Sequence, residues 1–310
     1  MTLKENKNID NDEIDVIELI SALWKHKLKI IILTLTFAIC SVFYALSIPN
    51  QYFANTLLIA AQSDQNNISN LGQIGGLASL AGVNIGSSNQ ASESDIAIEV
   101  MQSRSFIEDF ILENELSVNL MAAIGWNESS KKLVFDDKIY DVKSNKWLIE
   151  NKLGDFGPSS WELFLKFSSI LDVTKDKQTG FISVSIEFYS PLLSKEWLDL
   201  YVNAINGYMK EKKLIEVTRN IEYLQNEINK TSVSEMREVF YTIIEEQTKN
   251  KMLAAVNPEY AFKVVNPSMI PVEKSKPNRS FICIMSTLFG LILSVVSILF
   301  YEIFIKKKNK

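Results

Sequence analysis

IIILTLTFAICSVFYALSI at residues 30–48 and FICIMSTLFGLILSVVSILFY at residues 281–301 decide the architecture of this 310-residue chain. Neither stretch contains a charged residue. A helix rises about 1.5 Å per residue, so about 20 apolar residues are needed to cross a hydrocarbon layer roughly 30 Å thick. A core helix of a soluble protein would carry a polar stripe, and these stretches lack one. The sequence therefore predicts a transmembrane helix near each end.

A cleaved secretory signal is the alternative for the first stretch, because Ala45-Leu46-Ser47 has the form of a cleavage site. Against this alternative, the apolar run exceeds the usual signal core of about 7–15 residues, and a long polar leader precedes it. Both observations favour a retained helix.

Lysines flank the outer ends of both stretches, and such cations tend to stay in the cytoplasm. They are Lys25, Lys27, Lys29, Lys306, Lys307, Lys308 and Lys310. Basic residues also lie on the inner side of the second stretch, namely Lys274, Lys276 and Arg279. The difference in positive charge between the two ends of that stretch is therefore incomplete. The favoured topology has a cytoplasmic segment 1–29, helices 30–48 and 281–301, a domain 49–280 on the far side, and a cytoplasmic tail 302–310.

The middle region is acidic and free of cysteine. Residues 49–280 hold 23 of the 32 Lys plus Arg and 30 of the 37 Asp plus Glu. This balance argues against nucleic acid or another polyanion bound in a basic groove. Cys40 and Cys283 both lie in the apolar stretches, so no disulfide is expected in the middle region.

Two segments outside the predicted core have distinctive compositions. Apolar residues from Ile14 to Trp24 recur on one helical face, which fits either an amphipathic helix on the membrane surface or the first turns of the membrane helix. The glycine-rich run LGQIGGLASLAG at residues 71–82 lacks the spacing of a phosphate-binding loop. We expect a flexible loop there.

Hydrophobic periodicity predicts the elements of the middle region. Residues 51–61, 180–190 and 261–265 read as strands, and the second of these alternates most clearly. Residues 94–116 read as a helix with Ser94-Asp95 as its N-cap. These elements predict a mixed α/β domain.

A long amphipathic helix is predicted over about 194–256, where apolar residues recur at spacings of three and four. Unbroken, it would reach on the order of 90 Å. A break is an alternative near residues 231–235, because Ser232 and Glu235 have the spacing of a capping box. Whether it is unbroken or divided, this helix would need packing partners to cover its apolar stripe.

Prolines and small residues mark the approach to the second membrane stretch. Pro267, Pro271 and Pro277 punctuate segment 266–279 and predict a stiff connector. Within the membrane stretch, Ser286, Gly290 and Ser294 lie four residues apart, as do Ser41 and Ala45 in the first. Small residues at this spacing let helix backbones approach closely.

Catalytic signals are weak throughout. The single histidine, His26, lies among lysines before the first membrane stretch, which excludes a histidine-based catalytic or metal centre in the middle region. Carboxylate pairs such as Asp136-Asp137 have the pattern of a solvated surface. We expect a protein that is not an enzyme and that needs no cofactor or metal.

Five segments together carry a family resemblance. They are DEIDVIELISALWKHK at 12–27, LGQIGGLASLAG at 71–82, SPLLSKEWLDLYVNAINGYM at 190–209, RNIEYLQNEINKTSVSEMREVFYTIIEEQ at 219–247 and NPEYAFKVVNPSMIPVEKSKPNR at 257–279. With the two membrane stretches, they resemble the Wzz-type chain-length determinants, the polysaccharide co-polymerases of bacterial inner membranes.

The resemblance implies an α+β protein, with a membrane-proximal α/β domain and a long protruding helix between two transmembrane helices. It also implies a ring-like periplasmic homo-oligomer. Such an oligomer sets the modal length of lipopolysaccharide O antigen with a membrane-bound polymerase, in possible contact with the nascent polysaccharide. No catalytic residues come with the resemblance. The functionally sensitive positions it suggests are Pro267, Pro271, Pro277 and Gly290, to which the small-residue spacing adds Ser286 and Ser294.

Two other functions stay open. A co-polymerase for capsule or exopolysaccharide would work with a separate tyrosine kinase, because the sequence itself contains no G-x-x-x-x-G-K-[ST] motif. A two-crossing sensory receptor would need a cytoplasmic output module, and fewer residues follow the second stretch than such a module requires.

Overall fold

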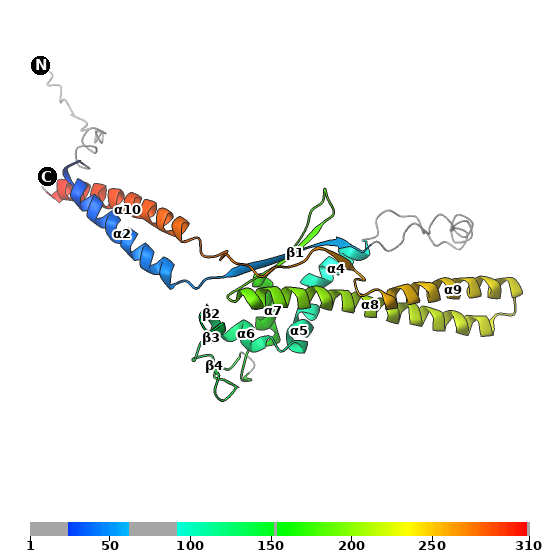
Figure 1. The fold of residues 1–310 in the computed structure, drawn as a ribbon. Coiled ribbons are helices and arrows are strands. Elements are labelled where there is room, and N and C mark those ends of the chain that lie inside the picture. Colours follow the sequence, from blue (N-terminus) through cyan, green and yellow to red (C-terminus); the bar gives the residue numbers. More distant parts are fainter. Residues whose placement is uncertain (1–23, 62–91, 152–153, 309–310) are drawn as a thin grey trace, which may run out of the picture. The chain divides into compact units, whose positions relative to one another are not determined.

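The computed structural model describes residues 24–61, 92–151 and 154–308, and the chain divides into two compact units (Figure 1). Unit 1 joins the two ends of the sequence, Met1–Pro49 and Lys276–Lys310, and unit 2 is Asn50–Ser275. The predicted amphipathic segment up to residue 23 and the glycine-rich run lie outside the described residues.

Unit 1 is a helical hairpin of α2 (Lys27–Ser47) and α10 (Arg279–Lys308), which pack side by side (Figure 1). Lys27–Ser47 and Arg279–Tyr301 are each long and apolar enough to cross a membrane. Nearly all of the two predicted stretches lies in these helices. The predicted mixed fold with an apolar helix at each end is therefore confirmed.

Unit 2 contains an antiparallel sheet in the order β6-β7-β1-β8. Its strands are β1 (Tyr52–Ala60), β6 (Leu171–Lys175), β7 (Ile182–Phe188) and β8 (Phe262–Asn266). All three predicted strands occur, and β6 is an addition. Because β1 and β8 are paired, the chain enters and leaves unit 2 on neighbouring strands.

The core of unit 2 lies between this sheet and the first half of α8 (Pro191–Lys230). Ile182, Val184, Ile186 and Phe188 of β7 are buried, as the alternation predicts. Trp197 and Tyr201 of α8 are also fully buried, and the Trp197 ring lies 4.5 Å from the Phe188 ring between centroids. Aromatic rings from α5 (Arg104–Glu113) and α7 (Ser160–Ile170) lie beside Tyr201, at centroid distances of 4.9 Å for Phe110 and 5.4 Å for Phe167.

Short helices and two small hairpins complete unit 2. They are α4 (Glu93–Gln102), α5 (Arg104–Glu113), α6 (Ser117–Ala122), α7 (Ser160–Ile170), β2 (Ala123–Asn127), β3 (Lys132–Phe135), β4 (Tyr140–Asp141) and β5 (Lys146–Trp147).

The structure differs in two ways from the helix predicted over 94–116. It breaks at Ser103, which has extended dihedral angles of φ −73° and ψ 146°. Its N-cap is Ser92 and not Ser94, since Ser92 has extended backbone and accepts a hydrogen bond from the Asp95 backbone N–H at 3.1 Å. The Asp95 carboxylate accepts from the Ser92 N–H in return, which completes a capping box.

The helix predicted over 194–256 is two helices, α8 (Pro191–Lys230) and α9 (Ser234–Val256), which fold back on each other (Figure 1). The sequence left open whether this helix is continuous, and the structure has the break near residues 231–235 that was one of the two alternatives. The predicted capping box does not form, because the N-cap of α9 is Val233 and no side chain caps it. Extended backbone at the caps Thr231 and Val233 turns the chain instead.

Candidate functional site

The connector between β8 and α10 is fixed at two points within unit 2. Ser268 is buried and hydrogen bonded to the Asp199 carboxylate on α8, and the other oxygen of that carboxylate pairs with Lys195 at 2.5 Å. Farther along, the Ser275 backbone N–H donates to the Gln51 carbonyl at 2.8 Å. The Ser275 hydroxyl donates to the Glu187 carboxylate at 2.5 Å. These contacts hold the connector on α8 and on the sheet.

The predicted prolines lie in and after this anchored segment. Pro267 is exposed and directly precedes the Ser268 anchor, whereas Pro271 is half-buried between the two anchors. Pro277 is half-buried, and the Lys276–Pro277 peptide bond is cis. Residues 267–278 form no helix or extended strand, in agreement with the predicted proline connector. No sequence pattern identifies Ser268, Asp199 or Ser275 as anchors of the connector.

The small residues of α10 face α2 within the same chain. Gly290 is buried, and a Cβ atom built on it would lie 2.6 Å from the Cβ of Phe37. That separation is closer than real Cβ contacts allow. Only glycine fits this close approach without a shift of one helix.

Further serines and alanines continue the same contact. Ser294 is fully buried and its hydroxyl lies 3.4 Å from that of Thr34, while Ser286 is half-buried. On α2, the buried residues are Ser41 and Ala45. Both predicted small-residue sets therefore contribute to packing within one protomer.

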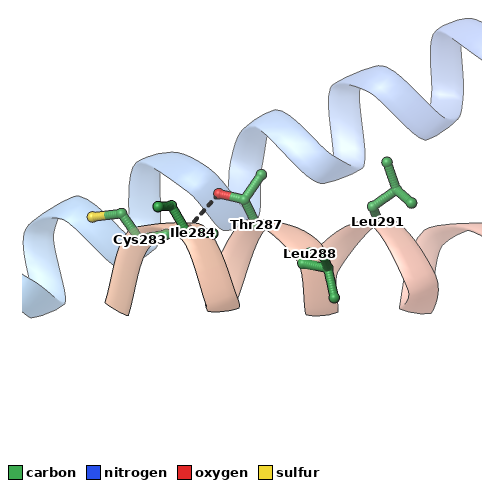
Figure 2. A pocket seen from close by; sticks show the side chains of 5 residues that line it. All are labelled: Cys283, Ile284, Thr287, Leu288 and Leu291. Atoms are coloured by element: carbon green, nitrogen blue, oxygen red, sulfur yellow. Dashed lines mark hydrogen bonds between the residues drawn. The ribbon is translucent and has the colours of Figure 1, made fainter. Parts of the chain in front are cut away.

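A shallow apolar groove lies along one side of α10 (Figure 2). Its lining side chains are Cys283, Ile284, Thr287, Leu288 and Leu291. The only hydroxyl among them, on Thr287, donates to the Cys283 carbonyl of its own helix at 2.7 Å. A lining without charge, whose one polar side chain is already satisfied, suits a hydrocarbon environment.

Titratable groups with shifted pKa values in unit 2 make structural contacts. Burial raises the pKa of Tyr201, whose hydroxyl donates to the Met101 carbonyl. Hydrogen bonds from Lys175 and Ser92 lower the pKa of Asp95 to about 2. Over the described residues, no group of His, Cys, Asp or Glu side chains has an arrangement that would hold a metal ion.

The hairpin of α8 and α9 exposes large apolar side chains over much of its length. In α9 only Ala254 is buried. The exposed set is Ile215, Tyr223, Val233, Met236, Val239, Tyr241, Met252, Leu253 and Val256. Apolar side chains that form a large contiguous surface mark an interaction face.

The family model described as Wzz, chain length determinant protein, matches residues 12–113. Among solved structures, the chain is similar to a "full-length bacterial polysaccharide co-polymerase", with 13% identity and a TM-score of 0.40, covering 96% of this chain and 100% of that one. It is also similar to a fragment of WzzB, a polysaccharide co-polymerase from Salmonella Typhimurium. There the identity is 12% and the TM-score 0.30, covering 73% of this chain and 100% of the fragment. No curated protein sequence matches.

The family model confirms the predicted resemblance to the Wzz-type chain-length determinants. Its match includes the first apolar helix, β1, α4 and α5. The match supports the resemblance over residues 12–113, and the described part of the chain has two helices long and apolar enough to cross a membrane.

Proposed function

We propose that this protein is a non-enzymatic regulator that sets the modal length of lipopolysaccharide O antigen made by a polymerase-dependent pathway. The match of residues 12–113 to the chain-length determinants carries the proposal. Unit 2 would lie in the periplasm, with both termini in the cytoplasm, because lysines flank the outer ends of the two apolar helices. The partner would be a polysaccharide polymerase in the inner membrane.

The protein would act as a homo-oligomer assembled through α8 and α9. This proposal is supported by the exposed side chains of Tyr241, Met252 and Val256. Removing such apolar surface from water is favourable, so a contact between copies would stabilise the assembly. Identical protomers can cover one another's apolar faces in a closed ring. Both helices would then contribute to a coiled-coil-like contact between copies.

The connector and the membrane hairpin would link the shape of the oligomer to the polymerase. Anchors at Ser268 and Ser275 fix the connector to unit 2. The proposed functionally sensitive positions are Pro267, Pro271, Pro277, Ser286, Gly290 and Ser294.

A polysaccharide ladder gel tests the proposal, comparing wild type with a gene deletion and with Pro271→Ala. We expect deletion to abolish the modal band cluster and Pro271→Ala to shift or broaden it. An unchanged ladder in the deletion strain would refute the proposed function. Loss of secreted polymer with a normal lipopolysaccharide ladder would instead indicate a capsule or exopolysaccharide co-polymerase.

A further inference from the structure

The connector between β8 and α10 exposes apolar side chains between its two anchors. Val272 is 93% exposed, the largest value for any large apolar side chain that the structure describes, and Ile270 is 49% exposed. The anchors at Ser268 and Ser275 are polar, because each hydroxyl is hydrogen bonded to a carboxylate. They hold the backbone in place without burying the apolar side chains, which therefore face away from unit 2.

The second anchor lies close in sequence to both membrane helices. The Arg279 side chain donates to the Ala45 carbonyl at 3.2 Å, so the start of α10 lies beside the end of α2. Gln51 follows the last residue of α2 by four positions, and Ser275 precedes the first residue of α10 by four. An extended chain spans at most about 3.6 Å per residue, so the hydrogen bond between Gln51 and Ser275 lies within about 14 Å of the helix ends, and Val272 within about 25 Å. Chain length alone therefore keeps this part of the connector close to the bilayer surface.

The charges of this segment suit a lipid headgroup layer. From residue 267 to residue 279 the sequence holds Lys274, Lys276 and Arg279, with Glu273 as the single acid. Lys274 is exposed. A lysine reaches lipid phosphate groups while the stem of its side chain stays in apolar surroundings.

The outer face of the sheet extends the apolar surface beside the second anchor. Phe53 of β1 is 45% exposed and is the cross-strand neighbour of Glu187. The Glu187 carboxylate is the group that accepts from the Ser275 hydroxyl. Directly opposite residues of an antiparallel pair have Cβ atoms about 5 Å apart. An exposed aromatic ring therefore lies next to the anchor.

Backbone geometry limits how deeply this segment can enter a bilayer. Residues 267–278 form no helix or extended strand, and unpaired backbone N–H and C=O groups are not tolerated in hydrocarbon. The backbone therefore stays in the headgroup layer. Only apolar side chains such as Val272 pass the boundary to the acyl chains, as they do in segments that lie on a membrane surface.

We propose that Ile270, Val272 and Lys274, together with Phe53, form a docking surface for the bilayer leaflet on the side of unit 2. The apolar side chains meet the acyl chains and Lys274 meets lipid phosphate. The connector is then held by unit 2 at its anchors and by lipid between them. The inference rests on the membrane crossing of α2 and α10 and not on the proposed role in polysaccharide length.

Lipid quenching in the full-length protein tests this proposal. A chain with Cys40→Ala and Cys283→Ala receives one new cysteine, Ile270→Cys or Val272→Cys, labelled with an environment-sensitive nitrobenzoxadiazole dye. The protein is placed in phosphatidylcholine nanodiscs, with and without phosphatidylcholine that carries a doxyl quencher near the top of an acyl chain. We expect blue-shifted emission at both positions and loss of most of that emission with the doxyl lipid.

Two further labelled positions serve as controls. Leu288→Cys, at an exposed position in the apolar stretch of α10, should be quenched by the doxyl lipid. Val233→Cys should not be quenched, because it lies beyond the far end of the 40-residue α8, which is about 60 Å long. An unquenched Leu288 label would remove the membrane crossing and overturn the proposal with it.

Two results at Val272 would also overturn the proposal. Water-like emission without doxyl quenching would show that the side chain stays in solvent. Blue-shifted emission that the doxyl lipid does not quench would show that protein, such as a second copy, covers the position.

A charge on the docking surface separates insertion from mere proximity to lipid. Val272→Asp, read by the label at Ile270, should lose most of the doxyl quenching, since a carboxylate is costly to transfer into acyl chains. Val142→Asp places the same charge at another exposed valine of unit 2 and should leave the quenching unchanged. Quenching that survives Val272→Asp would overturn docking through Val272.

Discussion

At the residue scale, Gly290 lies where α10 approaches α2 too closely for a larger side chain. A single methyl group at this position meets the Cβ, Cγ and Cδ2 atoms of Phe37 at 2.6–3.1 Å. We expect Gly290→Ala to destabilise the hairpin by about 1–3 kcal/mol, since overpacking forces the helices apart. Thermal unfolding of the full-length protein in detergent measures this change.

Gly207 provides the matched control for that substitution. It lies within α8, and nothing lies within 4 Å of an added Cβ atom there. Gly207→Ala should stabilise the protein by roughly 0.5–1 kcal/mol through helix propensity. If both substitutions had the same effect, the close approach to Phe37 would not be the cause.

Asn206 is the residue that fixes β8 to α8. Its buried amide donates to the Phe262 carbonyl at 3.0 Å and accepts from the backbone N–H groups of Ala261 and Phe262 at 2.8 Å each. Asn206→Leu leaves these groups unpaired, and each buried unpaired group costs about 1–3 kcal/mol. We expect loss of hydrogen-exchange protection at Ala261 and Phe262, with Asn203→Leu, exposed on the same helix, as the neutral control.

At the element scale, the start of α4 should be sensitive to acid. The pKa of Asp95 is lowered from 3.8 to about 2 by hydrogen bonds from Lys175 and Ser92. A carboxylate with a depressed folded pKa stabilises the fold above its unfolded pKa. That contribution is lost as pH falls from about 4 through about 2.

Hydrogen exchange of the α4 amides as a function of pH tests this expectation. Wild type should be better protected than Asp95→Asn at pH 5, and the difference should shrink as pH approaches 2. Asp109→Asn, at an exposed position of α5, should resemble wild type throughout. A difference between wild type and Asp95→Asn that is constant with pH would contradict the role of Asp95 ionisation.

Most elements of this fold could be predicted from the sequence, because their signals are local. Uncharged length marks α2 and α10, and strict alternation marks β7. Helix ends were harder, since Ser92 and Ser94 are equally good caps by composition and only the backbone angles choose between them. The turn at residues 231–233 contains neither Gly nor Pro, so only a possible break could be foreseen.

Long-range contacts of the candidate site could not be predicted in the same way. Ser268 and Asp199 are 69 residues apart, and no spacing rule links them. The sequence identified Gly290 and Ser294 as small residues in a helix that permit close packing. The sequence does not show that the packing partner of these residues is α2 of the same chain. That contact is seen only in the folded hairpin, in which Phe37 lies against Gly290.

At the scale of the whole molecule, the exposed face of α9 should control assembly. Tyr241→Glu with Met252→Glu places two charges where the proposed contact between copies would bury apolar side chains. Burying an unpaired charge is costly, so association should weaken on the order of tenfold or more. Light scattering after size-exclusion chromatography of the full-length protein measures the assembly.

Asn250→Glu is the control for that double variant, since it adds a charge at an exposed position of α9 that is already polar. It should leave the assembly mass unchanged. A wild-type protein that is monomeric at micromolar concentration would refute the proposed homo-oligomer. An assembly that tolerates both glutamates would place the contact elsewhere.

The first and last residues of unit 2 lie next to each other. The Ser275 N–H meets the Gln51 carbonyl at 2.8 Å, and β1 and β8 run as neighbours behind that bond. Unit 2 is in this sense a cassette, a continuous segment whose two neighbouring ends lead to the two helices of unit 1. Exchange of residues 50–275 with the corresponding part of a chain-length determinant joins the chain at two places, after Pro49 and before Lys276. If the proposed role in polymer length is right, such a chimera would separate the contribution of the cassette from that of the hairpin.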